Sequence, residues 1–289
     1  MKEFRERLKD KDVILGDGAM GTMLQKVGLV SGEIPEDWNE KHPEKVLDIH
    51  KQYIEAGAEL IEANTFGGSF IRLKEAGLEA KLTKLNRLGV ELAKEAAEGK
   101  HYVSSSIGPT GKILAPYGPV SKEEVLNSYR MQIEVLVEAG VDALHFETMI
   151  DLEELILGVK AAKEFDIPII AQMNLNTEAK SLMGDSVEEI VSRLDELQVD
   201  LMGINCTPGA KKTLPLIEEY NKFTDTPLSV FPNAGAPILK GEEVYYPEVP
   251  SDYIPFVKPF IENNVKLIGG CCGSTPELIA AMKAELNRI

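Results

Sequence analysis

Three cysteines carry the clearest chemical signal in this sequence of 289 residues. Cys206 follows one short apolar run, and the adjacent Cys271 and Cys272 follow another. Glycines on both sides of the pair allow backbone conformations in which both sulfurs turn to one side. Thiolates select zinc over magnesium or calcium, and three protein ligands with a fourth position open are typical of catalytic zinc sites. The sequence therefore predicts a zinc site formed by Cys206, Cys271 and Cys272.

Two other interpretations of the cysteines stay open. Free cysteine is often buried as a small apolar residue, although such thiols would be scattered through strand and helix interiors rather than gathered at strand ends. A disulfide between Cys271 and Cys272 is the other interpretation, and a reducing compartment disfavours it. The odd number of cysteines itself indicates reduced thiols.

Three thiolates determine which chemistry a zinc ion could support. Their negative charge makes the ion a poor Lewis acid toward water, but a substrate thiol in the fourth position would lose its proton near neutral pH and stay nucleophilic. The chemistry expected is activation of a thiol for attack on an alkyl group. Asn233, at the end of the strand expected between those of the cysteines, is predicted to hold the fourth position when substrate is absent.

A glycine-rich segment, residues 16–21, has the G-x-G-x-x-G spelling of a dinucleotide fingerprint. It supports a nucleotide-dependent oxidoreductase only weakly, because no acidic residue ends a second strand at the required distance. We interpret it as a turn whose N–H groups near Gly18 and Ala19 hold a small anion, with Asp17 facing an ammonium group. Glu147 supplies a second carboxylate, so the set predicts an amino acid site. For each carboxylate alone, a helix N-cap (Asp17) or a surface ion pair (Glu147) explains the residue equally well.

All these residues end short apolar runs that alternate with helical segments, which predicts parallel strands joined by right-handed crossovers. The eight runs lie at residues 13–15, 60–63, 102–105, 143–146, 169–173, 201–204, 228–231 and 266–269. Eight such units predict an α/β fold, a (β/α)8 TIM barrel, formed by a single domain over residues 1–289. An open doubly wound sheet is the alternative.

A barrel brings the C-terminal ends of its strands together at the rim that holds the active site. Asn64 and Ser106 stand at such ends and are expected to join the substrate-binding residues. His145 lies inside a predicted strand, and we expect it to pack between the barrel and its helices. Glutamates three residues after Ser121 and Ser186 predict capping boxes at two helix starts. The longest irregular segments lie at residues 28–42, 107–120 and 233–252, where we expect binding loops.

Composition excludes several classes of protein. The 47 acidic residues against 31 basic ones give a formal charge of −16, which argues against binding to nucleic acid or to an anionic membrane. No apolar run approaches the roughly 20 residues that a membrane span needs. The charged N-terminal segment lacks the apolar stretch of a secretory signal. We therefore expect a cytoplasmic protein.

Seven segments together resemble the homocysteine S-methyltransferase family. They are residues 16–22, 62–66, 107–111, 146–149, 203–206, 232–235 and 269–273. The likeness spans nearly the whole chain, and it is most specific at Asn-Cys and Gly-Gly-Cys-Cys-Gly. The sequence is most similar to the N-terminal homocysteine-binding modules of cobalamin-dependent methionine synthases. The resemblance implies a (β/α)8 barrel with zinc on Cys206, Cys271 and Cys272, and homocysteine sulfur as the incoming ligand. It also implies Asp17, Glu147 and the adjacent backbone as the amino acid clamp.

The resemblance also implies a methyl donor. Methylcobalamin is favoured by the Pro-Asn-Ala-Gly segment, and it would be bound by another domain or protein, with folate-binding domains or proteins as further partners. Nothing here matches those modules, so the chain is expected to be a fragment or a stand-alone homologue. Betaine-dependent relatives carry a tyrosine zinc ligand where this chain has Thr148, although Trp38 would suit a methylammonium group. S-methylmethionine remains a further donor. A non-catalytic zinc- or thiol-binding barrel would not need the clamp of Asp17 and Glu147.

Overall fold

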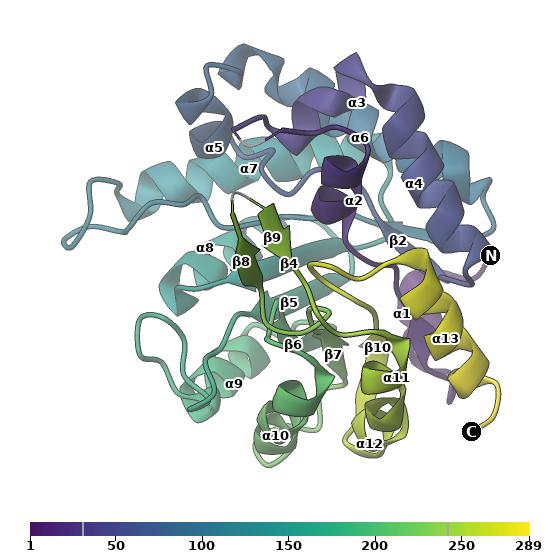
Figure 1. Cartoon of the computed structure of the whole chain (residues 1–289). Helices are drawn as coiled ribbons and strands as arrows, with labels where there is room; N and C mark the ends of the chain where they lie inside the picture. The colour runs from purple at the N-terminus through teal and green to yellow at the C-terminus, as the bar shows by residue number, and fades with distance from the viewer. Residues whose placement is uncertain (31, 242) are drawn as a thin grey trace.

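The computed structural model of this chain describes residues 1–30, 32–241 and 243–289. All eight apolar runs form strands, and helices separate them along the chain (Figure 1). The eight strands are β1 (Ile14–Leu15), β2 (Leu60–Glu62), β3 (Tyr102–Ser104), β4 (Leu144–Met149), β5 (Ile169–Met173), β6 (Leu201–Asn205), β7 (Leu228–Phe231) and β10 (Val265–Ile268).

The strands lie side by side in the order of the chain. Six form a parallel sheet in the order β1-β10-β7-β6-β5-β4, and β2 and β3 form a parallel pair. Backbone hydrogen bonds join the two sheets at both seams: Glu59 N–H donates to the Leu15 carbonyl (2.7 Å) between β2 and β1, and Ser105 N–H donates to the Ala143 carbonyl (3.0 Å) between β3 and β4. This order has no switch point, so the doubly wound alternative is wrong and the predicted (β/α)8 barrel is confirmed.

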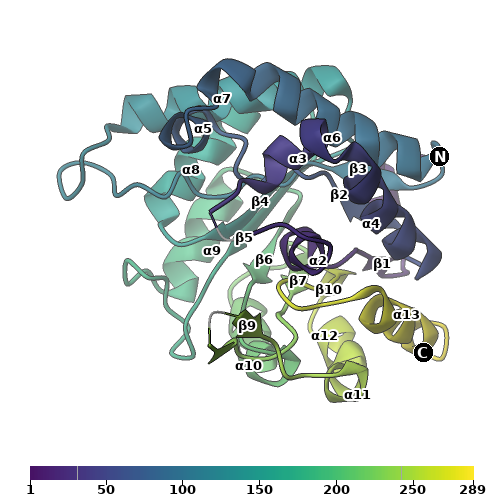
Figure 2. The same cartoon turned by 45° about the horizontal axis from the view of Figure 1, so that its top comes forward.

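An outer layer of helices surrounds the strands (Figure 2). Its helices are α4 (Pro43–Glu55), α6 (Leu82–Ala97), α7 (Lys122–Ala139), α8 (Leu152–Ala162), α9 (Val187–Glu196), α10 (Ala210–Tyr220), α12 (Val257–Glu262) and α13 (Pro276–Leu286). Ser121 and Ser186 begin α7 and α9 with the predicted capping boxes. In the described part of the chain, no helix is both long and apolar enough to cross a membrane.

Shorter elements fill the connections. The helical ones are α1 (Phe4–Leu8), α2 (Met20–Lys26), η1 (Pro35–Asp37), α3 (Trp38–Lys41), α5 (Phe70–Glu75), η2 (Glu79–Lys81), α11 (Pro250–Tyr253) and η3 (Ile254–Phe256). An antiparallel hairpin of β8 (Ile238–Lys240) and β9 (Glu243–Tyr245) stands in the segment 233–252 (Figure 1). The expectation of irregular loops at 28–42 and 233–252 is wrong where η1, α3, the hairpin and the start of α11 form.

The interior of the barrel is built in layers. At the N-terminal ends of the strands, seven apolar residues pack around Phe4 of α1. Each lies in a different strand or, for Ala143, directly before one; they are Ile14, Leu60, Tyr102, Ala143, Ile170, Leu201 and Leu267. Side chains alternate along a strand, so the residues two positions further on also point inward. Four of those are polar and buried or nearly so: Glu62, Ser104, His145 and Gln172. The buried Ser229 of β7 lies beside them, because its hydroxyl accepts a hydrogen bond from Gln172.

His145 therefore belongs to the barrel interior. The expectation that it packs between the barrel and its helices is wrong, because its neighbours Leu144 and Phe146 are the β4 residues that join the core outside the strands. A lone histidine within an apolar run gave no indication of which face it would take.

Candidate metal centre and substrate pocket

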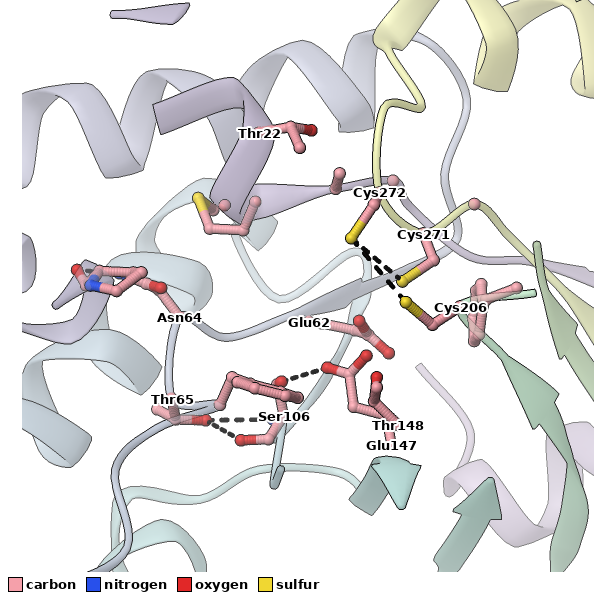
Figure 3. A pocket seen from close by; sticks show the side chains of 18 of the residues that line it. Thr22, Glu62, Asn64, Thr65, Ser106, Glu147, Thr148, Cys206, Cys271 and Cys272 are labelled. Carbon is pink, nitrogen blue, oxygen red and sulfur yellow. Dashed lines mark hydrogen bonds between the residues drawn. The ribbon is translucent and has the colours of Figure 1, made fainter. Parts of the chain in front are cut away.

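The three cysteine sulfurs form one cluster at the C-terminal rim of the barrel. The Cys206 and Cys271 sulfurs each lie 4.0 Å from that of Cys272 (Figure 3). All three sulfurs lie within 4.8 Å of one another, and no disulfide joins them. Tetrahedral zinc with bonds of about 2.3 Å would hold its sulfurs about 3.8 Å apart. The spacing fits such an ion, and the interpretation of the cysteines as scattered buried thiols is wrong.

Local backbone conformation turns the sulfurs inward. Cys206 has a φ of 56°, a left-handed conformation that costs a non-glycine residue of the order of 1–3 kcal/mol. Three hydrogen bonds hold it there: its N–H donates to the Phe231 carbonyl, and its carbonyl accepts from the side chains of Asn174 (3.0 Å) and Asn233 (3.2 Å). On the other side of the cluster, Gly273 takes a φ of 81° directly after Cys272.

Asn233 has the properties of a fourth ligand. The residue is 4% exposed, and its Oδ1 is buried without a hydrogen-bond partner among the described residues. Its Nδ2 is used by the Cys206 carbonyl, so the oxygen is the atom left over. A buried acceptor without a partner is unfavourable unless something else binds it. Asn233 stays our prediction for the fourth position.

The charges of the three thiols depend strongly on one another. Hydrogen bonds from Cys206 and Cys271 lower the pKa of Cys272, and the Tyr246 hydroxyl acts in the same direction. The pKa of Cys271 is raised by its hydrogen bonds with the other two thiols and by burial. One thiolate is therefore favoured, and further ones are opposed by burial and repulsion. A divalent cation removes that repulsion, so the donor set fits zinc. Tyr246 was not predicted from the sequence, because it lies in a segment expected to be a loop.

A cavity of about 260 Å³ opens beside the sulfurs. The cysteines form one wall, and carboxylates and hydroxyls from the ends of β2, β3 and β4 form the opposite wall (Figure 3). Its lining includes the predicted site residues Gly18, Ala19, Asn64, Ser106, Glu147, Cys206, Cys271 and Cys272. The structure thus brings residues from six strands to one small space.

Glu147 is fixed at both carboxylate oxygens. The Ser106 hydroxyl donates to Oε1, and Asn205 Nδ2 donates to Oε2 at 3.0 Å. Burial, followed by repulsion from Glu62, raises the pKa of Glu147 to about 8. The surface ion pair considered for Glu147 is wrong, because its partners are neutral side chains inside the rim. Ser106 positions this carboxylate, whereas it was predicted only as a contact to substrate.

Asp17 lies deeper in the protein than its predicted role in facing a substrate ammonium group requires. It is 2% exposed, its Oδ2 accepts the Glu62 N–H at 2.9 Å, and its Oδ1 has no hydrogen-bond partner among the described residues. Burial and repulsion from Glu62 raise its pKa well above the ordinary value. The alternative role as a helix N-cap is wrong, because α2 is capped by Ala19. The carboxylate that lines the cavity from this side is Glu62, which was not among the predicted site residues.

Two other predicted contact residues already have partners. The Ala19 N–H donates to Ser274 Oγ at 3.2 Å. Asn64 donates from Nδ2 to the Pro35 carbonyl and to Asn39 Oδ1, both at 2.8 Å, so its amide group holds the loop beside the cavity. At Gly18, a Cβ atom would lie 2.8 Å from the Tyr53 ring, so the close approach itself requires glycine.

Comparisons with known proteins agree with this geometry. A family model described as homocysteine S-methyltransferase matches residues 14–286. The methionine synthases of Mycobacterium leprae and Mycobacterium tuberculosis are 32% and 31% identical in alignments of 295 and 296 positions, and each alignment covers 96% of this chain. The chain spans 24% and 25% of their lengths, about a quarter.

Solved structures of the Escherichia coli homocysteine methyltransferase MmuM match along the whole chain. Its metallated form is 25% identical with a TM-score of 0.82, and the match covers 98% of this chain and 99% of that one. Its apo form, at 26% identity, has a TM-score of 0.77 with 98% and 100% covered. The chain belongs to the homocysteine S-methyltransferase family, a family of methyltransferase enzymes.

Proposed function

We propose that this chain binds homocysteine and activates its thiol for methyl transfer, which gives methionine. The observation that carries this proposal is the division of one cavity into a wall of three cysteine sulfurs and a wall of buried carboxylates. A substrate that fits both walls has a thiol at one end and an ammonium group at the other. Homocysteine has both groups.

Zinc would be held by Cys206, Cys271 and Cys272, with Asn233 in the fourth position until the substrate thiol replaces it. Bound there, zinc supplies a charge that lowers the pKa of the substrate thiol and keeps the resulting thiolate nucleophilic. Such thiolate ligands need a reducing environment, and this supports our expectation of a cytoplasmic location.

The chain's own residues orient the substrate. Glu147 is held by Ser106 and Asn205, so its carboxylate is preorganised for the substrate ammonium group. The ammonium charge would in turn lower the pKa of Glu147. Asp17, behind the cavity wall, adds negative charge, and the backbone at Gly18 and Ala19 is our prediction for the substrate carboxylate. In the transfer itself, a sulfur–carbon bond forms as the methyl group leaves its donor, which keeps the electron pair.

The donor that we infer is methylcobalamin, carried by another domain or protein and leaving as cob(I)alamin. Support comes from the methionine synthases, of which this chain spans about a quarter, and a folate-binding partner is inferred on the same ground. The second candidate is a stand-alone homocysteine methyltransferase that uses S-methylmethionine or betaine, favoured by the full-length match to MmuM.

Trp38 does not strengthen the betaine alternative. The residue is 3% exposed, it packs against His42, and the Lys45 ammonium lies 4.8 Å from its ring centroid. An aromatic ring that is buried and already paired with a lysine is not free to hold a methylammonium donor.

Zinc content and donor use test the proposal together. Zinc per chain is measured first, and homocysteine is then supplied with methylcobalamin, S-methylmethionine or betaine while methionine is followed. We expect one zinc per chain and methionine from methylcobalamin. Zinc retained at full affinity by a Cys206→Ser, Cys271→Ser double variant would contradict the metal site. Homocysteine binding without methionine from any donor would support the non-catalytic alternative.

A further inference from the structure

A buried ion pair lies directly beneath the cavity and has no role in the function proposed above. His145 of β4 is fully buried, and its Nδ1 pairs with a carboxylate oxygen of Glu62 from β2. The His145 ring also packs against Phe231, with ring centroids 5.5 Å apart. Its backbone N–H donates to Ser105 Oγ at 3.1 Å. The imidazole is therefore held in one place by strands on both sides.

Glu62 connects this pair to the cavity. Its side chain is 17% exposed and lines the cavity wall, where its carboxylate lies beside that of Glu147 (Figure 3). Its backbone N–H is bound by the Asp17 carboxylate. Three carboxylates from three neighbouring segments thus gather at one end of the cavity, and Glu62 is the one that extends from the interior layer to the cavity surface.

Such a cluster needs positive charge. Carboxylates in a buried site are unfavourable unless a cation or hydrogen-bond donors compensate them. His145 faces the cluster from the barrel interior: burial opposes its protonation, but the neighbouring carboxylates of Glu62 and Glu147 raise its pKa. A substrate ammonium group would face the same cluster from above. One oxygen of Glu62 can then bond the imidazole while the other bonds the substrate amine.

We propose that Glu62 determines specificity for the substrate's ammonium group, and that His145 is the positioning residue that holds Glu62 toward the cavity. This inference rests on the proposed function, since it concerns the same substrate. It adds a third carboxylate, and it places Glu62 at the cavity surface with Asp17 behind it. The sequence spacing did not suggest this arrangement, because it depends on the inward alternation of β2 and β4.

The test compares two ligands that differ only in the amine. Binding of L-homocysteine and of 4-sulfanylbutanoate, which keeps the thiol and the carboxylate, is measured by calorimetry on zinc-loaded protein. In Glu62→Gln we expect homocysteine affinity to fall about 10- to 100-fold, as for loss of a charged hydrogen bond, and affinity for the analogue to change less than about 2-fold. Glu62→Asp is expected to keep part of the preference.

His145→Gln is expected to lower the same preference by about 3- to 10-fold through a less well-positioned Glu62. Ser229→Ala is the matched control, because Ser229 lies in the same buried layer but bonds Gln172, at 3.0 Å. It should leave the preference unchanged. Zinc content and thermal unfolding are measured for every variant, so that a general loss of structure is recognised.

A Glu62→Gln variant that binds both ligands as the unaltered protein does would overturn this inference. That outcome differs from failure of the proposed function, in which the unaltered protein would bind neither zinc nor homocysteine. If His145→Gln does not fold, the Glu62 variants still decide whether the third carboxylate recognises the amine, and His145→Asn repeats the positioning test.

Discussion

The two walls of the cavity are built in different ways. The sulfur wall comes from the loops after β6 and β10, where a left-handed Cys206 and a glycine after Cys272 turn the sulfurs to one point. The carboxylate wall comes from inward positions of β2 and β4, and Asp17 after β1 lies behind it. Backbone conformation at the rim therefore produces the metal site, whereas side-chain alternation inside the barrel produces the substrate site.

The difference has a consequence for charge. The sulfur wall accumulates more than one negative charge only when a metal binds, since burial and repulsion otherwise keep protons on two of the three thiols. The carboxylate wall already contains its own counter-charge in His145 and its own donors in Ser106 and Asn205. We therefore expect changes on the two walls to be separable, one affecting zinc and the other affecting the amino acid.

The largest effect is expected on the sulfur wall. Cys272→Ala removes the thiol that both other cysteines contact, so zinc affinity should fall by more than about 100-fold, beyond the loss typical of outer-shell changes. Metal content after dialysis and competition with a chelator measure this. Folding without zinc should be unchanged, because the core lies elsewhere. A variant that keeps zinc but loses homocysteine would show that the walls are not separable.

On the carboxylate wall, we expect a substitution to weaken homocysteine binding and to leave zinc binding unchanged. Glu147→Gln should weaken homocysteine binding about 10- to 100-fold while zinc stays bound, because it removes a charge that faces the ammonium group. Glu154→Gln is the matched control: Glu154 is equally a buried glutamate on this side of the barrel, but it bonds the Thr110 N–H and the Tyr129 hydroxyl. Calorimetry with homocysteine measures both variants, and equal losses in the two would refute the assigned role.

Asn233 tests whether the fourth zinc ligand changes when homocysteine binds. If its Oδ1 fills the fourth position only without substrate, Asn233→Ala should lower zinc affinity roughly 10-fold in the free protein. With saturating homocysteine, the zinc affinities of the variant and the unaltered protein should differ much less. Chelator competition with and without homocysteine gives both values. An equal loss in the two conditions would mean that Asn233 supports the site only structurally.

The smallest effect concerns pH. Glu147 has a folded pKa of about 8, raised from 4.5, so between these values the folded state binds a proton that the unfolded state has lost. This contribution to stability is fully present below about pH 4.5 and is lost as pH rises to 8. Its slope is at most about 1.4 kcal/mol per pH unit, and partial exposure reduces it.

Denaturant unfolding of the zinc-free protein from pH 5 to 8 measures that slope, which should be shallower in Glu147→Gln. Homocysteine should also displace the proton from Glu147, and calorimetry in buffers of different ionisation enthalpy detects its release. An unchanged slope in the variant would show that Glu147 is already ionised at pH 5.

The same contrast explains what could be predicted from the sequence. The barrel and the cysteine cluster were predictable, because apolar runs alternate with helices and because Cys206 and Cys271-Cys272 end such runs. Glu62 and His145 were not recognised. A glutamate and a histidine within strands give no local signal of function, and their pairing needs the register of β2 against β3 and of the seam between β3 and β4.

The hairpin β8–β9 and Tyr246 were missed for a related reason. Each strand of the hairpin has three residues, too few for a period-two pattern to stand out from a loop. Tyr246 reaches Cys272 only because the segment after the hairpin returns across Gly273, where a Cβ would lie 2.3 Å from the tyrosine. Contacts between loops distant in the chain are set by the whole fold.

X-ray absorption at the zinc edge tests the central claim most directly, since it counts sulfur atoms around the metal. The claim is that homocysteine sulfur completes a site made by Cys206, Cys271 and Cys272. We predict three sulfurs and one oxygen or nitrogen in the zinc-loaded protein, and four sulfurs after homocysteine is added. A sulfur count that stays the same after homocysteine has bound would contradict the account.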